Sequence, residues 1–318
     1  MKKLLVPILS AIIGLTSYGQ TSQITTILTA DIAQGEKLIE AYFTPMSESF
    51  GASLNNGWYN TAKPHKLGGF DVTFTVNTVI IPTDAKAFKV EDAFGNIFTS
   101  NESNASTVLG STDATAMIYK NSSSGIETSF DMPGGFETPV MPLPMIQAGI
   151  GLIKNTAIDI RYMPMLNVGD NINVNLFGAG VKHDLLQWIP GIGDAIPMSL
   201  SLQGGYTSLN TELEISNQEV SLNTKATTIN IVASKKILMF TGYAGIGYNS
   251  AKTTFSSNNT FELGNVQFNE QVEIDFESNN NLRTNIGLRL NMAVVTIQAD
   301  YTFSKYPTTT LGLGVSLR

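Results

Sequence analysis

The feature that most constrains this chain is an alternation of apolar and polar residues that recurs along most of its length. In FDVTFTVNT, the stretch from Phe70 to Thr78, apolar and polar residues take turns. Because successive side chains of a β-strand point to opposite faces, this period of two predicts strands with one apolar and one polar face. The alternation predicts strands at residues 69–80, 146–153, 156–163, 172–182, 197–207, 222–234, 238–249, 283–292, 293–304 and 308–318. The predicted fold class is all-β and antiparallel.

Two kinds of architecture are built from such strands. A sandwich or soluble barrel buries the apolar face, whereas a transmembrane barrel turns it toward lipid and keeps the polar face in the lumen. The polar faces here are rich in Thr, Asn, Ser, Gln and Gly, and only 14% of the chain is charged. A solvent-facing sheet usually carries more charge than that. The composition therefore favours an antiparallel transmembrane β-barrel.

The lengths of the connections support the same interpretation. Bacterial barrels have an even number of strands, short periplasmic turns and longer outer loops. The connections at 153–156 and 234–238 are short and would be periplasmic, whereas those at 208–221 and 250–282 are long and would lie outside. Residues 81–145 are too long for a plain loop. We expect this extracellular insertion to form either one more hairpin or a lid. The predicted barrel therefore has 10–12 strands, the higher number if the hairpin forms.

The first 19 residues have the features of a secretory signal peptide. Lys2 and Lys3 precede an apolar stretch, and the small residues Ser17 and Gly19 flank a cleavage site after residue 19. The chain is therefore predicted to be exported, and the strands place it in the outer membrane.

The following segment, residues 20–68, precedes the barrel of residues 69–318. Apolar residues spaced by three and four predict a helix between residues 24 and 50, which we expect to end near Pro45. Two placements stay open for this segment: a plug folded into the lumen or a helix in the periplasm beneath the barrel. The candidate plug residues are Leu38, Phe43 and Asn60.

Six charged residues fall on the polar, lumen-facing side of the predicted strands. They are Asp71, Asp159, Arg161, Arg283, Arg289 and Asp300. Unpaired charges are costly in a confined space, so three acids and three bases predict a paired network that fills or orders the lumen. The second interpretation is that one of the arginines contacts the carboxylate of a ligand.

Residues 183–196 interrupt the strand pattern on the predicted periplasmic side, where the other connections are short. Their apolar and polar residues predict a periplasmic amphipathic helix that caps the barrel, with His183, Leu186 and Trp188 as the cap residues. Trp is favoured where protein meets the membrane interface, which suits a position at the barrel rim.

The sequence contains no constellation typical of hydrolysis, metal binding or cofactor binding. The chain has two histidines and no cysteine, and a G-x-S-x-G motif is absent. We therefore expect no enzyme activity, no catalytic residue, no metal and no cofactor. The net charge of −7 argues against nucleic acid as a partner. The expected partners are the lipid bilayer and a small hydrophobic ligand.

Three stretches carry a resemblance to a known group of proteins: LNNGWYNTAKPHKLGGFDVTFTVN (54–77), MPLPMIQAGIGLIKNTAIDIRYMP (141–164) and GAGVKHDLLQWIPGIGDAIPMSLSLQGGY (178–206). With the closing TTLGLGVSLR, they make the chain resemble an uncharacterised Bacteroidota family of outer-membrane barrels, similar in style to long-chain fatty-acid transporter (FadL-like) barrels. Those transporters carry an Asn-Pro-Ala motif in an N-terminal plug, and the nearest match here is Asn60-Thr61-Ala62, without the proline.

The resemblance implies transport of small or hydrophobic molecules across the outer membrane. The alternative is a structural or surface-interaction barrel that transports nothing and displays its extracellular loops for binding.

Overall fold

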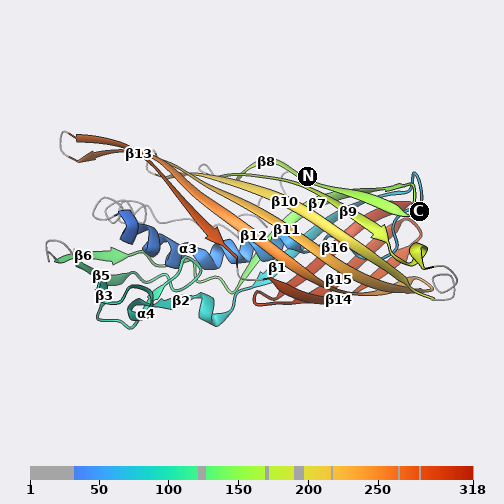
Figure 1. The fold of residues 1–318 in the computed structure, drawn as a ribbon, viewed down its shortest axis with the longest axis horizontal. Helices are drawn as coiled ribbons and strands as arrows, with labels where there is room; N and C mark the ends of the chain where they lie inside the picture. Colours follow the sequence, from blue (N-terminus) through green and yellow to red (C-terminus); the bar gives the residue numbers. More distant parts are fainter. Residues whose placement is uncertain are drawn as a thin grey trace.

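The computed structural model describes residues 32–120, 127–168, 172–189, 197–215, 218–263, 266–278 and 281–317. The predicted signal peptide lies outside these residues. Ten antiparallel strands close into a barrel, which confirms the predicted fold class (Figure 1). They are β1 (Phe70–Ile80), β7 (Val140–Leu152), β8 (Thr156–Val168), β9 (Ile172–Asp184), β10 (Ser199–Ile215), β11 (Gln218–Ile237), β12 (Phe240–Leu263), β14 (Leu282–Met292), β15 (Val295–Phe303) and β16 (Thr308–Leu317). The barrel is closed by the pairing of β1 with β16 and of β11 with β12.

The two faces of the barrel wall differ as the alternation predicts. The outward side chains of Ile160, Ile231 and Leu313 are 48%, 48% and 56% exposed. Inward side chains such as Gln203 and Thr302 are fully buried. A barrel with an apolar outside and a polar inside suits a lipid environment.

At the end opposite the short turns, the pattern of the wall is reversed. Here β10, β11 and β12 rise beyond the barrel, and β13 (Val266–Glu277) pairs with the outer part of β12. Their inward side chains are apolar and buried, as in Leu222 and Phe255, and their outward side chains are charged, as in Lys225 and Lys252. The prediction of loops at 208–221 and 250–282 is therefore wrong. These segments stay extended because their apolar face packs on a helix.

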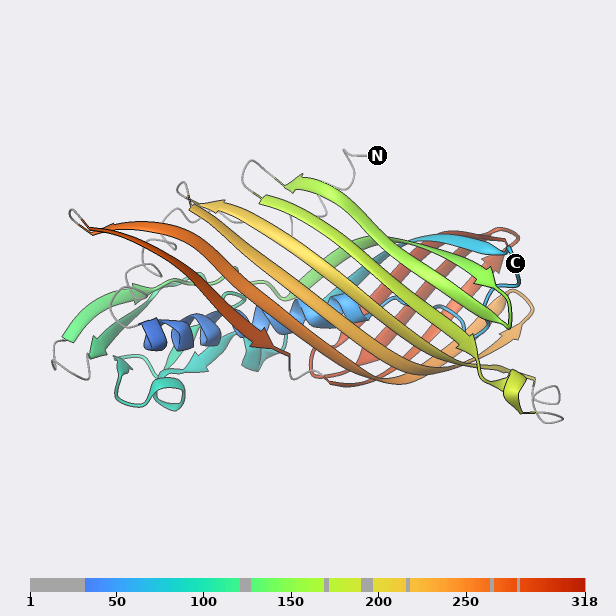
Figure 2. The same cartoon turned by 45° about the horizontal axis from the view of Figure 1, so that its top comes forward.

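That helix is α3 (Ile32–Asn55), which starts among the raised hairpins and runs into the barrel (Figure 2). The predicted end at Pro45 is wrong. Proline removes one backbone donor, but the Ser49 hydroxyl binds the Pro45 carbonyl at 2.7 Å and the Thr44 hydroxyl binds the Glu40 carbonyl at 2.6 Å. Packing also supports the helix at this point, since the ring centroids of Phe43 and Phe255 lie 5.7 Å apart. No helix of the described residues is long and apolar enough to cross a membrane.

The insertion between β1 and β7 folds into a small unit of its own. It contains η1 (Thr83–Ala85), β2 (Ala87–Lys89), α4 (Val90–Phe94), β3 (Phe98–Ser100), β4 (Asn104–Ser106), β5 (Thr115–Lys120) and β6 (Glu127–Met132). Its strands form a two-stranded and a three-stranded sheet that are separate from the barrel, so the alternative of an additional barrel hairpin is wrong. The insertion also ends earlier than residue 145, because β7 begins at Val140.

The insertion packs on the side of α3 away from the raised hairpins. One apolar core joins Leu38 and Tyr42 of the helix to Phe98 and Met117 of the insertion. We call this assembly the head: residues 81–139, residues 32–50 of α3, the raised ends of β10–β13 and the 304–307 loop. The opposite end of the barrel, with the turns at 153–155, 238–239 and 293–294, is called the short-turn end.

Candidate functional site

The barrel interior is filled by residues 51–65, which we call the lumen segment. Two buried arginines on opposite walls bind its backbone. Arg161 of β8 donates to the Leu54 carbonyl at 2.8 Å and to the Asn56 carbonyl at 2.6 Å. Arg283 of β14 donates to the Asn55 carbonyl at 2.6 Å. A guanidinium group offers several donors in a fixed geometry, so each arginine satisfies carbonyls that the end of α3 leaves without helical partners.

The side chains of two asparagines complete this grip. The Asn56 Oδ1 atom accepts from Arg283 at 2.7 Å and from the Thr302 hydroxyl at 2.6 Å. Asn60 Oδ1 accepts from Arg289 at 2.5 Å, and Asn60 Nδ2 donates to Gln298. The three arginines of the sequence analysis and the candidate plug residue Asn60 therefore meet in one site.

Two aromatic residues of the lumen segment lie in spaces left by glycines of the wall. The Trp58 ring is 1% exposed and packs over Gly180 and Gly205, where an added Cβ would lie 2.7 Å and 2.4 Å from ring atoms. The Arg161 guanidinium lies 3.6 Å from the centroid of the same ring. The Tyr59 hydroxyl donates to Asn285 at 2.7 Å. The sequence analysis missed both aromatics; the signal was inward-facing glycine on neighbouring strands.

The three lumen aspartates are buried at other positions. Asp71 contacts His65 Nε2 at 2.5 Å, and Asp300 accepts from the Tyr243 hydroxyl at 2.8 Å. Asp159, which is 2% exposed, lies beside Gln147 and Lys182. A cavity between Asp71, Asp159 and Trp58 measures about 10 Å³. That is room for about one water molecule.

At the short-turn end, the predicted cap is smaller than an amphipathic helix. His183 lies within β9, and the helix that follows is the single 3₁₀ turn η2 (Leu186–Trp188). Trp188 Nε1 donates to His183 Nε2 at 2.8 Å, while His183 Nδ1 contacts the Thr156 hydroxyl at 2.8 Å. Strand pairing with β10 continues to Asp184, which leaves too few residues for a longer helix before residue 190. The rest of the predicted helix, 190–196, lies outside the described residues.

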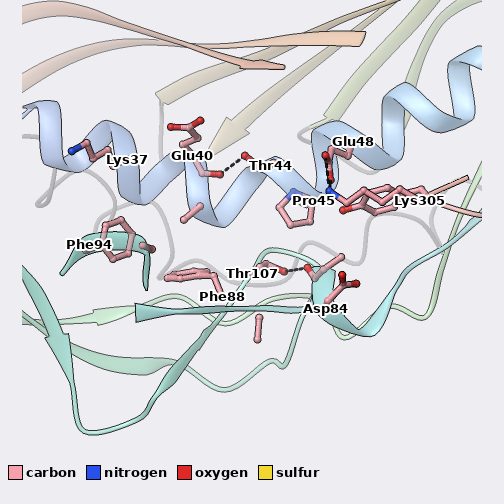
Figure 3. A pocket seen from close by; sticks show the side chains of 15 residues that line it. Lys37, Glu40, Thr44, Pro45, Glu48, Asp84, Phe88, Phe94, Thr107 and Lys305 are labelled. Atoms are coloured by element: carbon pink, nitrogen blue, oxygen red, sulfur yellow. Dashed lines mark hydrogen bonds and ion pairs between the residues drawn. The ribbon is translucent and has the colours of Figure 1, made fainter. Parts of the chain in front are cut away.

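The head contains a cavity of about 540 Å³ between α3 and the insertion (Figure 3). Its apolar walls include Pro45, Phe88 and Phe94. Phe88 and Phe94 pack edge to face with ring centroids 5.8 Å apart. Such a cavity has the size of small-molecule sites, and its lining combines apolar with charged side chains.

Charged side chains lie at both ends of the head cavity, with Lys37 and Glu40 toward one end and Glu48 and Lys305 at the other (Figure 3). The Glu48 carboxylate is 2% exposed and accepts from Lys305 Nζ at 2.8 Å and 2.9 Å. Burial raises the pKa of the adjacent Tyr306 hydroxyl, and the negative charge of Glu48 raises it further. Asp84 lines the same region and is exposed. A ligand would meet both charges and aromatic faces here.

Among the described residues, no group of three or more His, Cys, Asp or Glu side chains is placed to hold a metal ion.

Comparison with known proteins gives a family but no activity. A model of the family of unknown function DUF6588 matches residues 1–317. The chain belongs to the DUF6588 family. No curated protein of described function matches it.

Several solved structures resemble this DUF6588 chain in fold. The translocator domain of the autotransporter NalP from Neisseria meningitidis is 10% identical, with a TM-score of 0.33 over 87% of this chain and 96% of that one. The β domain of the Bordetella autotransporter BrkA is 9% identical, with a TM-score of 0.33 over 79% and 98%. The toluene transporter TodX from Pseudomonas putida is 8% identical, with a TM-score of 0.28 over 85% and 96%. Their likeness to the DUF6588 chain is confined to the barrel fold.

Proposed function

We propose that this protein is an outer-membrane barrel with a closed lumen that holds the head at the cell surface as a binding module. The observation that carries the proposal is the set of contacts by which the barrel wall holds the lumen segment. Arg161 and Arg283, on opposite walls, bind consecutive carbonyls of it, and Trp58 occupies the space beside Gly205. A lumen filled in this way supports anchoring rather than open conduction. The apolar outer face and the signal sequence support the location.

The head cavity is the proposed binding site. Its volume of about 540 Å³ falls within the range of roughly 300–1,000 Å³ that is usual for small ligands. The aromatic walls favour an apolar body, and the Glu48–Lys305 pair offers a polar anchor at one end. We infer a small, largely hydrophobic ligand that carries one polar group.

A thermal-shift screen of small hydrophobic compounds on the detergent-solubilised protein tests the binding function. Ala87 lines the cavity and is exposed, so Ala87→Trp fills the cavity with little disturbance of the fold. Ala116 is equally exposed on β5 and is absent from the cavity lining, which makes Ala116→Trp the matched control. Compounds that stabilise the wild-type protein and Ala116→Trp should fail to stabilise Ala87→Trp. Equal stabilisation of all three proteins would exclude this cavity.

Transport is the second candidate, and the polar character of the lumen contacts favours it. Arg161, Arg283 and Arg289 hold the lumen segment through hydrogen bonds, and water can replace these bonds if the segment leaves the wall. The resemblance to fatty-acid transporter barrels belongs to this candidate.

A disulfide lock separates the two candidates. The hydroxyls of Thr61 and Ser234 are 3.2 Å apart, and the chain contains no cysteine, so Thr61→Cys with Ser234→Cys can join the lumen segment to β11. We expect no conductance and no uptake from the reconstituted wild-type protein, and none from the double-cysteine variant whether it is oxidised or reduced. Uptake that stops on oxidation and returns on reduction would support transport instead.

A further inference from the structure

The outer wall of the barrel carries a groove near the short-turn end. It measures about 880 Å³ and crosses β11, β12, β14 and β15. Strand register places its outward residues in two adjacent rows: Lys235, Gly242, Leu288 and Ala299 form one, and Ala233, Ala244, Ile286 and Tyr301 form the other. Small and long residues alternate in the first row, whereas in the second row Ala233 and Ala244 lie together beside Ile286 and Tyr301. Ala233, Gly242 and Ala244 form the floor of the groove on β11 and β12, and Leu288 and Ile286 of β14 form one side.

A single outward charge, that of Lys235, lies in this groove lining. Lys235 is exposed and lies near the end of β11. Leu238, three residues later, is 87% exposed. The same pairing of a lysine with a large exposed apolar residue recurs at this end of the barrel, at Lys66–Leu67 and Ile153–Lys154. Apolar side chains that enter the acyl boundary beside lysines that reach phosphates are typical of a membrane interface.

We propose that this groove is a specific site for one glycerophospholipid, with an acyl chain on the floor of small residues and the anionic headgroup phosphate on Lys235. The inference goes beyond the function of the head and depends only on the membrane location proposed above. An acyl chain matches the lining because, apart from Lys235, the exposed lining of the groove is almost wholly apolar. The phosphate matches Lys235 by charge, and the short-turn end corresponds to the periplasmic leaflet, where phospholipids face this wall.

Gly242 offers a clean way to fill the groove. No atom lies within 4 Å of an ideal Cβ at this position, and its φ is outside the left-handed region, so a larger side chain fits without backbone strain. Gly242→Leu therefore occupies the floor of the groove while leaving the barrel intact. Lys235→Gln removes the charge and keeps the length of the side chain.

Native mass spectrometry of the full-length protein in detergent, titrated with phosphatidylglycerol and separately with phosphatidylcholine, tests the site. The wild-type protein should retain one phosphatidylglycerol. Gly242→Leu should weaken its retention about tenfold, as expected for the loss of roughly two buried methylene contacts. Lys235→Gln should reduce the preference for phosphatidylglycerol over phosphatidylcholine.

Two control variants match these changes. Ala148 faces outward on β7, on another part of the wall, so Ala148→Leu should retain the lipid. Lys236 is exposed next to Lys235 but pairs with Thr241, whose side chain faces the lumen, so Lys236→Gln should also behave as the wild type. The proposal is overturned if Gly242→Leu retains the lipid normally, or if Ala148→Leu loses it equally. A dimer of the chain that Gly242→Leu dissociates would also overturn it, by assigning the groove to a second copy. Because none of these variants touches the head cavity, the outcome is independent of the compound screen.

Discussion

At Gly205, the missing side chain is what allows the Trp58 ring to lie in the lumen. An ideal Cβ there would be 2.4 Å from Cε2 of the ring, which is far inside van der Waals contact. Gly205→Ala should therefore lower the free energy of unfolding by about 1–3 kcal/mol, the usual cost of overpacking a filled interior. Urea unfolding in detergent, followed by tryptophan fluorescence, measures this change.

The neighbouring glycine provides the control for that prediction. The nearest atoms to an ideal Cβ at Gly204 are 4.0 Å away, so Gly204→Ala should change the unfolding free energy by less than about 0.5 kcal/mol. Adding Trp58→Leu to Gly205→Ala should restore part of the lost stability, since the smaller side chain relieves the clash. Equal effects of the two alanines would show that Trp58 does not depend on this space.

Single residues also show which features of the site can be predicted from the sequence and which cannot. The period of two indicates that Arg161 points inward, and its side chain is fully buried. Its partners, the carbonyls of Leu54 and Asn56, are more than 100 residues away along the chain. Alternation encodes which way a side chain points but not which distant segment fills the space it points into. The aromatics Trp58 and Tyr59 were missed for the same reason.

At the scale of elements, the Glu48–Lys305 pair joins α3 to the loop between β15 and β16. Glu48 is 2% exposed, so removing its cation leaves a buried carboxylate unbalanced. Lys305 itself is 47% exposed, and solvent screens part of the interaction. Lys305→Met should therefore cost about 1–3 kcal/mol, below the range for fully buried pairs.

A double-mutant cycle tests this coupling. The double variant Glu48→Gln with Lys305→Met should be more stable than Lys305→Met alone. Without a cation nearby, burying a neutral amide costs less free energy than burying a carboxylate. The measured quantity is the unfolding free energy of the wild-type protein, both single variants and the double variant. Additive losses would mean that α3 and the loop are not joined through this pair.

Two of the elements that differ from their sequence predictions do so for the same reason. The pattern around Pro45 predicts the end of a helix, and the long outer connection at 250–282 is predicted to be a loop. In the structure α3 passes through Pro45, and β12 continues to Leu263. Each is supported by the other, since Phe43 packs against Phe255. Local propensity is overridden by a contact between segments that sequence patterns treat separately.

At the scale of the whole molecule, alternation and connection lengths were enough to predict a closed antiparallel barrel. They left open whether residues 20–68 lie in the lumen or beneath the barrel. An amphipathic helix before the first strand suits either position, since the apolar face of α3 needs only some apolar partner. The raised hairpins and the insertion supply that partner at the head, and neither can be recognised as a docking surface before the three-dimensional arrangement is known.

The path of the lumen segment predicts an orientation that can be measured on intact cells. The segment crosses the barrel and continues into β1, which starts at the short-turn end, so the first turns of α3 lie with the head at the opposite end (Figure 1). The chain has no cysteine, so single replacements can be labelled selectively. Glu91→Cys in the insertion and Lys37→Cys in α3 should both react with a membrane-impermeant maleimide. Ile237→Cys at the short-turn end is 61% exposed and should react only after the cells are opened. Labelling of Ile237→Cys but not of Glu91→Cys on intact cells would invert the barrel, and the proposed binding head would then face the periplasm.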